Sequence, residues 1–208
     1  MGVEITWMGH ATFRIAGSRV VYVDPWKVAS SPGDGHVVFV SHSHFDHLSA
    51  EDIRKVSARG AVLIAPPDVI SQVGSGYTLL PGDVFDADGV KVIGVPAYNV
   101  GKAFHPKANG WLGAVIEMDG VRTYYAGDTD KIDEMNDLSA IDVALLPVGG
   151  TYTLDAAEAA AAAEAIGCAA AIPYHFGEVV GSAADAAAFA DAAACKVHVL
   201  AGGESVRV

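Results

Sequence analysis

Short apolar runs separated by turn residues fill the first half of the chain. Runs such as Val20–Val23 and Val37–Val40 are too short for membrane spans and have the length and β-branched content of buried strands. The pair Asp119-Gly120 between two apolar runs predicts a hairpin turn. Strands are predicted at 3–7, 11–16, 20–23, 37–40, 61–65, 90–95, 112–118, 121–125, 142–146, 170–172, 197–200 and 204–207.

Three segments have the pattern of capped helices. The first begins after Ser49, and the other two cover about 155–166 and 183–194. Ser49 and Ser182 each have an Asp three residues further on, as in a capping box. The second helix consists almost entirely of Ala and Glu and ends at Gly167, a usual terminator. Because no linker interrupts this alternation, the sequence predicts one α/β domain over 1–208.

Length and composition fit a chain that folds around a core in the cytoplasm. It has 208 residues, 51% of them hydrophobic, and no apolar run approaches the roughly 20 residues of a membrane span. The first residues lack the basic start and apolar middle of a signal peptide. Cys168 and Cys195 stand alone in Ala-rich surroundings, which favours reduced core thiols over a disulfide or a metal pair.

The net charge of −12 argues against a nucleic-acid partner. Only 13 Lys and Arg are present, whereas binding through phosphates requires a basic surface, although a small basic patch can hide in an acidic total. A small-molecule substrate is therefore the expected partner, and a homo-oligomer is compatible with the sequence.

The segment Ser41-His42-Ser43-His44-Phe45-Asp46-His47 has the composition of a metal site. It directly follows an apolar strand, so His42 and His44 project to the same side, and the turn into the next helix brings Asp46 and His47 to a neighbouring position. Imidazole nitrogens and carboxylate oxygens suit zinc, manganese or ferrous iron. The alternative is a surface loop rich in histidine, which the placement at the carboxyl end of a strand disfavours.

Two later segments place further ligand types after strands. Asp128 follows Tyr124-Tyr125-Ala126-Gly127, and His175 follows Ile172-Pro173-Tyr174. Alone, each is more typical of a turn or capping residue. Behind the first cluster, they become candidates to complete a metal centre.

These segments together resemble the metallo-β-lactamase superfamily. The pattern of 42–47, the Gly127-Asp128-Thr129 turn and Tyr174-His175-Phe176 occur in the family's order. The chain is similar to the small hydrolases related to ascorbate-6-phosphate lactonase and N-acyl-phosphatidylethanolamine phospholipase D. The segments 8–13, 22–25 and 146–150 extend the resemblance over essentially the whole chain. It implies a four-layer αββα sandwich with the metals at one edge between two sheets.

The resemblance also implies roles for the candidate residues. His42 and His44 hold a first metal, Asp128 bridges, and Asp46, His47 and His175 hold a second. Asp46 is also the catalytic residue, which orients the nucleophile and carries a proton towards the leaving group.

The family usually adds a third histidine to the first metal, where this chain has Asn99. Either His105 folds back to replace it, or the first metal has fewer protein ligands.

Four other residues have candidate roles around the centre. His10 either reaches the metals or orients a ligand, and Asp24 is expected to accept a hydrogen bond from a ligand imidazole. Lys102 and Lys107 flank His105 and are candidates to meet an anionic substrate. His36 lies beside a strand away from the motifs and is expected to be structural.

The predicted function is hydrolysis by a metal-bound hydroxide. The cofactor is one or two divalent ions, with zinc favoured over manganese or iron, since such an ion lowers the pKa of bound water to about 7. The substrate is a small, anionic ester, lactone or phosphodiester. The rivals are a non-hydrolytic iron-binding redox or sensing module and an RNA phosphodiesterase.

Overall fold

Two mixed β-sheets form the centre of the molecule. The computed structural model describes residues 2–87 and 89–208, and within them each sheet has seven strands. The first sheet has the order β14 (Ser205–Arg207), β1 (Glu4–Gly9), β2 (Thr12–Ala16), β3 (Val20–Val23), β4 (Gly35–Phe39), β5 (Ser57–Ala65) and β6 (Tyr77–Thr78). The second has the order β13 (Lys196–Val197), β12 (Ala170–Tyr174), β11 (Val143–Pro147), β10 (Val121–Tyr125), β9 (Leu112–Met118), β8 (Val90–Pro96) and β7 (Val84–Ala87).

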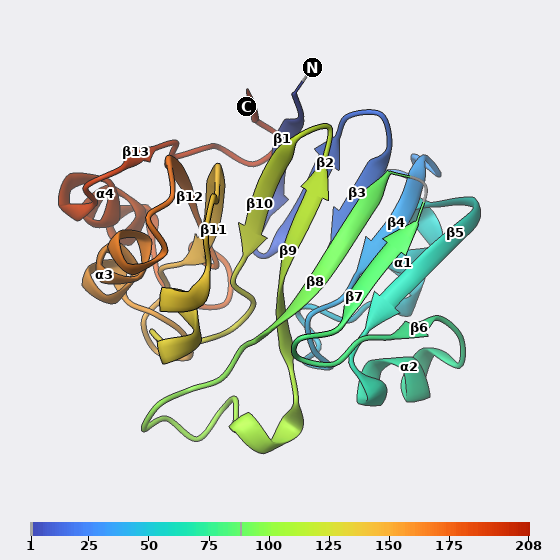
Figure 1. Ribbon diagram of the computed structural model, residues 1–208, viewed down its shortest axis with the longest axis horizontal. Helices are drawn as coiled ribbons and strands as arrows, with labels where there is room; N and C mark the ends of the chain where they lie inside the picture. Colours follow the sequence, from blue (N-terminus) through green and yellow to red (C-terminus); the bar gives the residue numbers. More distant parts are fainter. Residues whose placement is uncertain (1, 88) are drawn as a thin grey trace.

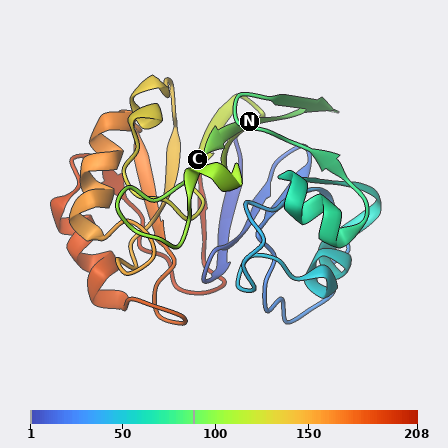
Figure 2. The same cartoon turned by 90° about the horizontal axis from the view of Figure 1, so that it is seen from below.

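Helices cover the outer face of each sheet (Figure 1). Helices α1 (Ala50–Val56) and α2 (Pro67–Val73) lie against the first sheet, and α3 (Ala156–Ile166) and α4 (Ala183–Ala192) against the second (Figure 2). A smaller apolar cluster fills the space beneath α1 and α2, while the main core lies between the sheets and extends under α3. This four-layer αββα arrangement confirms the predicted fold class.

Local sequence signals explain several element boundaries. Asp119 (φ 54°) and Gly120 (φ 82°) form the predicted tight turn between β9 and β10. The Asp155 side chain accepts a hydrogen bond from the Glu158 backbone in a capping box that starts α3, and Gly167 ends that helix in the left-handed conformation. Two single-turn 3₁₀ segments, η1 (Lys107–Asn109) and η2 (Asp133–Asp137), lie in the connections.

The structure corrects the predicted elements at three places. Helix α2 was not predicted, because Pro66-Pro67 reads as a breaker, although Pro67 occupies the first turn, where a proline fits. The short strands β6 and β7 were not predicted either. The predicted strand 197–200 is wrong, since β13 pairs only over Lys196–Val197.

No helix of the described residues is long and apolar enough to cross a membrane. Cys168 is buried and Cys195 half-buried; both are free thiols with their sulfur atoms 3.8 Å apart. Burial and the neighbouring Cys195 raise the pKa of Cys168 to about 12.

Strand direction gathers the predicted ligands at one edge. Strands β3 and β12 end immediately before Asp24 and His175, and strands β4 and β10 end one residue before the 41–47 segment and the Gly127-Asp128 turn. In Figure 1, β4 and β10 both point towards the lower edge of the sheets. The edge between the two sheets is therefore where the chemistry-bearing side chains meet.

Candidate metal centre

The seven predicted ligand residues lie together, and His10 joins them. Seven of these eight residues fall into two groups, and within each group the ligand atoms lie within 4.8 Å of one another. The first group is His42, His44 and His105, and the second is His10, Asp46, His47 and His175. Every member is buried except His44, which is half-buried.

Asp128 lies between the two groups. Its Oδ2 is 3.3 Å from His105 Nε2 and 3.2 Å from His175 Nε2, and its Oδ1 is 3.3 Å from His47 Nε2. One carboxylate thus faces histidines of both groups, which is the position that a bridging ligand needs.

The donor atoms fit divalent cations. Four buried atoms that point into the cluster have no hydrogen-bond partner among the described residues: His47 Nε2, His105 Nε2, His175 Nε2 and Asp128 Oδ1. Buried polar atoms without partners are uncommon in proteins and call for an explanation such as an ion. Zinc–nitrogen bonds of about 2.0–2.1 Å in a tetrahedron put neighbouring ligand atoms roughly 3.3 Å apart. The separation of 3.1 Å between His42 Nε2 and His44 Nδ1 and the three distances from Asp128 are close to that value.

Asp24 orients His47 of the second group through a hydrogen bond to the ring nitrogen that faces away from Asp128. It is fully buried, and its Oδ2 accepts hydrogen bonds from His47 Nδ1 at 2.7 Å and from the Tyr125 hydroxyl at 2.6 Å. This bond keeps the His47 proton on Nδ1 and leaves Nε2 facing Asp128. The hydrogen bond expected between Asp24 and a candidate ligand imidazole is therefore present. With both oxygens engaged, Asp24 supports the cluster from outside.

Ser41 extends the same support to the first group. Its backbone N–H donates to Asp24 Oδ1, and its hydroxyl donates to Asp24 Oδ2 at 2.6 Å. Since the single hydroxyl proton is used there, the Ser41 oxygen accepts from His42 Nδ1 at 2.9 Å. The Nε2 atom of His42 is consequently the unprotonated one, and it faces His44.

Asn99 holds His105 and does not itself join the cluster. The side-chain oxygen of Asn99 accepts from both the backbone N–H and the Nδ1 of His105, each at 3.0 Å. The amide nitrogen donates to Asp130 Oδ1 and to the Tyr152 carbonyl. Because Nδ1 donates, His105 presents an unprotonated Nε2 to Asp128. The structure thus places His105, and not Asn99, beside His42 and His44. That His105 replaces the third histidine as a metal ligand stays a prediction.

His10 lies deeper in the cluster than the sequence indicated. Its Nε2 is 3.0 Å from Asp46 Oδ2, and its ring lies 4.2 Å from that of His175, centroid to centroid. Its carbonyl accepts from the His175 backbone N–H and from Trp7 Nε1. His10 thereby joins β1 to the end of β12. It was not in the predicted ligand set, because a lone histidine after a strand carries little signal.

The backbone at the site is unusual in several places. His10, Asp24 and His175 adopt left-handed conformations, with φ of 46°, 42° and 61°. Such conformations are disfavoured in non-glycine residues and concentrate at functional sites. Gly127 (φ 68°) is required before Asp128, because a Cβ there would lie 2.7 Å from the Leu112 carbonyl oxygen. The Tyr174 hydroxyl donates to the Gly127 carbonyl at 2.6 Å and fixes this turn.

Burial and neighbouring charges set the protonation of the ligand side chains before a cation binds, which leaves Asp128 and His42 ready as ligands and gives His47 a proton to release. Burial, with His47 as a positive neighbour, holds the pKa of His42 well below its ordinary value. Burial alone would raise the pKa of Asp128, but His175 and His47 outweigh it and lower that pKa well below the usual range. Burial opposes the charge on His47, yet Asp128 and Asp24 raise its pKa well above the ordinary value. At neutral pH, Asp128 is thus ionised and His42 neutral, as metal ligands must be.

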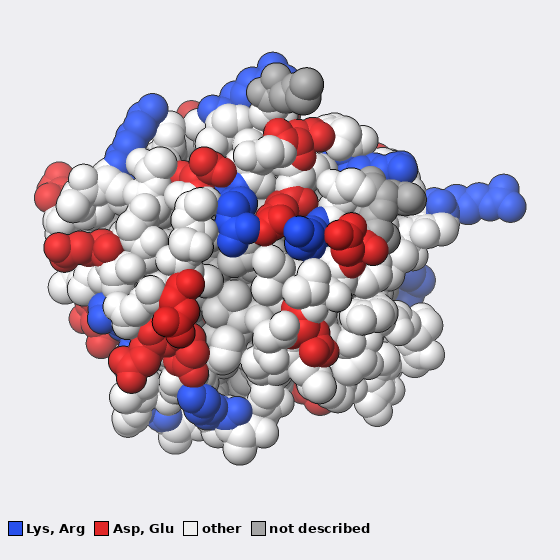
Figure 3. All heavy atoms as spheres, viewed as in Figure 1, with Lys and Arg blue, Asp and Glu red and all other residues white. Residues whose placement is uncertain are grey.

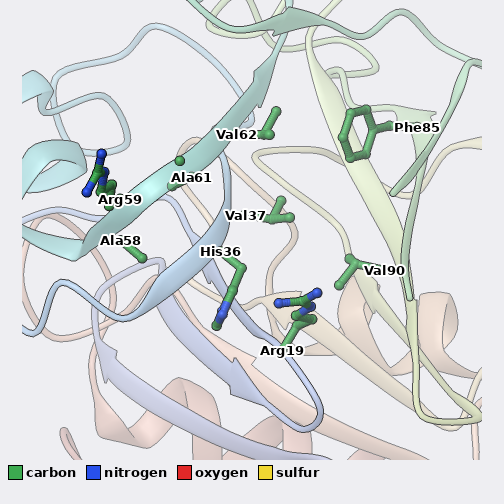
Figure 4. A pocket seen from close by; sticks show the side chains of 10 residues that line it. Arg19, His36, Val37, Ala58, Arg59, Ala61, Val62, Phe85 and Val90 are labelled. Atoms are coloured by element: carbon green, nitrogen blue, oxygen red, sulfur yellow. The ribbon is translucent and has the colours of Figure 1, made fainter. Parts of the chain in front are cut away.

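A cavity of about 330 Å³ opens onto the cluster. Its polar lining is His44, Asp46, His105, Asp128 and His175, and the rest is Phe45, Phe104, Tyr152 and Val179. A second cavity of about 190 Å³ lies elsewhere, between β4, β5 and β8, and is shown in Figure 4. Arg19, His36 and Arg59 contribute its charged or titratable side chains, and no carboxylate lines it. Only the first of these two cavities has a metal-ligating set.

The two lysines that were expected to meet the substrate have other partners. Lys102 Nζ lies 2.6 Å from Asp130 Oδ1 and donates to the Thr153 carbonyl. Lys107 pairs with Glu134 at 2.8 Å and lies over the Tyr98 ring. Neither lysine is among the residues that line the cavity, so the geometry gives no support to this role. His36 is exposed and accepts from the Val20 backbone N–H, in keeping with the structural role expected for it.

Comparison with known proteins gives similarity along the chain. The family model of the beta-lactamase superfamily domain matches residues 4–175. A UPF0173 metal-dependent hydrolase of Methanoregula boonei is 32% identical over 220 residues, covering 99% of this chain and 98% of the relative. A crystal structure from Parabacteroides distasonis has a TM-score of 0.86 at 29% identity and covers 95% and 92% of the two chains. Igni18, a metallo hydrolase from Ignicoccus hospitalis, has a TM-score of 0.82 at 25% identity, with coverages of 100% and 99%.

Proposed function

The chain belongs to the UPF0173 metal-dependent hydrolases of the beta-lactamase superfamily, and from this membership we propose a two-cation hydrolytic centre. The first group, with Asp128, holds one divalent cation, and Asp46, His47 and His175, with Asp128, hold the other. The observation that carries the proposal is the set of unpartnered, buried donor atoms around Asp128. The cations supply water of lowered pKa and polarise the scissile carbonyl or phosphoryl oxygen.

Residues of the chain orient the water, transfer its proton and hold the ligand imidazoles. Asp46 lines the cavity and has His10 on its Oδ2, so its carboxylate is placed to orient the attacking water and move its proton to the leaving group. Asp24, Ser41 and Asn99 keep the imidazoles in the tautomers that the cations require. Zinc as the metal and a cytoplasmic location stay predictions, as does the oligomeric state.

An ester, a lactone or a phosphodiester suits this centre, and the two cations would attract the negative charge of a phosphodiester or the carbonyl oxygen of an ester or lactone. RNA is disfavoured as a substrate. Figure 3 shows that the Lys and Arg side chains on the face in view are separated by acidic ones and form no continuous stripe. The backbone of a long polyanion needs such a basic track for its phosphates.

The experiment measures metal content and hydrolysis together. Purified protein is analysed for bound metals and then assayed on lactones, esters and phosphodiesters before chelation, after chelation and after zinc or manganese is restored. Hydrolysis should disappear on chelation and return with metal. His44→Ala should lose metal and activity, whereas His36→Ala, an exposed histidine outside the cluster, should keep both. Iron with redox activity but without hydrolysis would support the sensing alternative instead.

A further inference from the structure

Part of the lining of the cavity over the centre is apolar or aromatic. Besides the five polar residues, the lining consists of Phe45, Phe104, Tyr152 and Val179, which we call the apolar rim. The rim residues come from four separate segments: the 41–47 motif, the connection before His105, the connection after β11 and the connection after β12. The fold therefore brings apolar side chains from distant parts of the sequence to one opening.

The rim exposes large apolar side chains to water. Phe45 is 70% exposed, Phe104 46% and Val179 38%, so that three of the eight exposed large apolar side chains among the described residues lie around one cavity. A single exposed apolar side chain is ordinary, but a cluster of them marks a binding surface. The rings are also held in place. Phe104 packs edge-on against Tyr152 with centroids 4.7 Å apart, and Phe45 packs against Trp26 at 6.1 Å.

Among the described residues, the lining of the cavity offers no side-chain cation to a charged substituent. None of the described residues lining the cavity is Lys or Arg. The lysines of the adjacent segments are paired with acids: Lys27 with Glu178 at 2.7 Å, Lys102 with Asp130 and Lys107 with Glu134. A second carboxylate or phosphate on the substrate would thus lose water at the rim without gaining an ion pair.

We infer that the substrate carries an uncharged, apolar group next to the scissile bond, and that this group packs against the apolar rim. The inference rests on the proposed function and confines any negative charge to the scissile group itself. The cavity has room for roughly ten non-hydrogen atoms at about 30 Å³ each. A short alkyl chain or a phenyl ring is of that size, and the apolar side chains of Phe104 and Phe45 in the lining suit either.

Phosphonates test the rim without requiring turnover. Methylphosphonate, hexylphosphonate and 5-carboxypentylphosphonate share a head that binds metal and differ in the tail. Calorimetric titration into the metal-loaded protein should give hexylphosphonate about tenfold tighter binding than methylphosphonate, since burial of a couple of methylene groups suffices for that factor. The carboxylate tail should bring no gain. Equal affinity for the three compounds, or tightest binding of the carboxylate compound, would overturn the inference.

Variants of the rim residues test which side chains cause the preference for an apolar phosphonate tail. Phe104→Ser should remove the preference for hexylphosphonate and Phe104→Leu should keep it, while unchanged methylphosphonate affinity reports that His105 beside it is undisturbed. Val179→Lys should improve binding of 5-carboxypentylphosphonate about tenfold, because it supplies the missing cation. Val199→Lys is the matched control, since Val199 is similarly exposed and does not line the cavity.

The possible outcomes distinguish a failure of the apolar-rim inference from a failure of the proposed metal centre. If the protein binds metal and hydrolyses esters but binds all three phosphonates equally well, the inference about the apolar rim is wrong and the proposed metal centre stands. A protein whose hydrolysis survives complete metal removal refutes the proposed centre, and the inference with it. Retained hexylphosphonate preference in Phe104→Ser, together with no gain in Val179→Lys, would also contradict the inference.

Discussion

The two groups of the proposed centre are assembled in different ways. The second group comes from three places along the chain: His10 after β1, Asp46 and His47 after β4, and His175 after β12. The first combines two neighbours, His42 and His44, with His105 from the long connection between β8 and β9. Strands therefore fix the second group, whereas the first depends on a connection that hydrogen bonds must hold.

This difference in support predicts a difference in metal retention. All members of the second group are buried, while His44 in the first group is half-buried. His105 is held mainly through Asn99. Ligands held rigidly lose less freedom on binding, so the second group should retain its cation longer than the first. Partial chelation should consequently yield a protein with the second group still loaded.

Asp128→Asn should have the largest effect, because Asp128 faces both groups. Asparagine removes the negative charge that balances two cations, and its amide is a poorer ligand. We expect metal loss from both groups and a fall in kcat/KM of about a hundredfold or more. Metal analysis and assays measure this, with the exposed Asp137→Asn as control. Turnover like that of the wild type in Asp128→Asn would reduce Asp128 to a turn residue.

His105→Ala should affect one group and spare the other. The variant should lose the first cation while Asp46, His47 and His175 keep theirs. His175→Ala should show the reverse loss. Competition with a chelator measures each affinity, and hydrogen exchange should show the 99–109 segment opening faster in His105→Ala and in metal-free protein. An unchanged first-site affinity would mean that His105 is not a ligand.

The fold and the ligand motif were predictable because their signals are local. The 41–47 segment carries four ligand types at the end of one strand, and the turn at Asp119-Gly120 and the stop at Gly167 are set by neighbouring residues. The αββα layers followed from the resemblance and are confirmed. The assignment of the ligands to metals stays a prediction.

The remaining features depend on contacts between distant segments. His10 enters the cluster because its carbonyl accepts from His175, which no local pattern reveals. The candidate role of Lys102 gains no support, because Asp130, brought close by the fold, forms an ion pair with it. The short strands β6 and β7 are edge strands, whose pairing rests on a neighbour and not on their own pattern. The apolar rim is likewise invisible until its four segments meet.

Asn99→Ala should give the smallest effect and the sharpest test of how the first group is held. Asn99 touches His105 and not Asp128, so its loss should weaken the first cation about tenfold to a hundredfold and leave the second unchanged. The exposed Asn136→Ala is the control, and thermal unfolding of the metal-free variant reports any general damage.

A double variant separates positioning from a general structural role. If Asn99 acts by holding His105, then Asn99→Ala should add nothing to His105→Ala, because the side chain that it positions is already gone. If Asn99 merely stabilises the connection through Asp130 and the Tyr152 carbonyl, the two losses should add. Additive losses would mean that the first group does not depend on the hydrogen bonds between Asn99 and His105. Weaker metal retention by the first group would then come from the exposure of His44 alone.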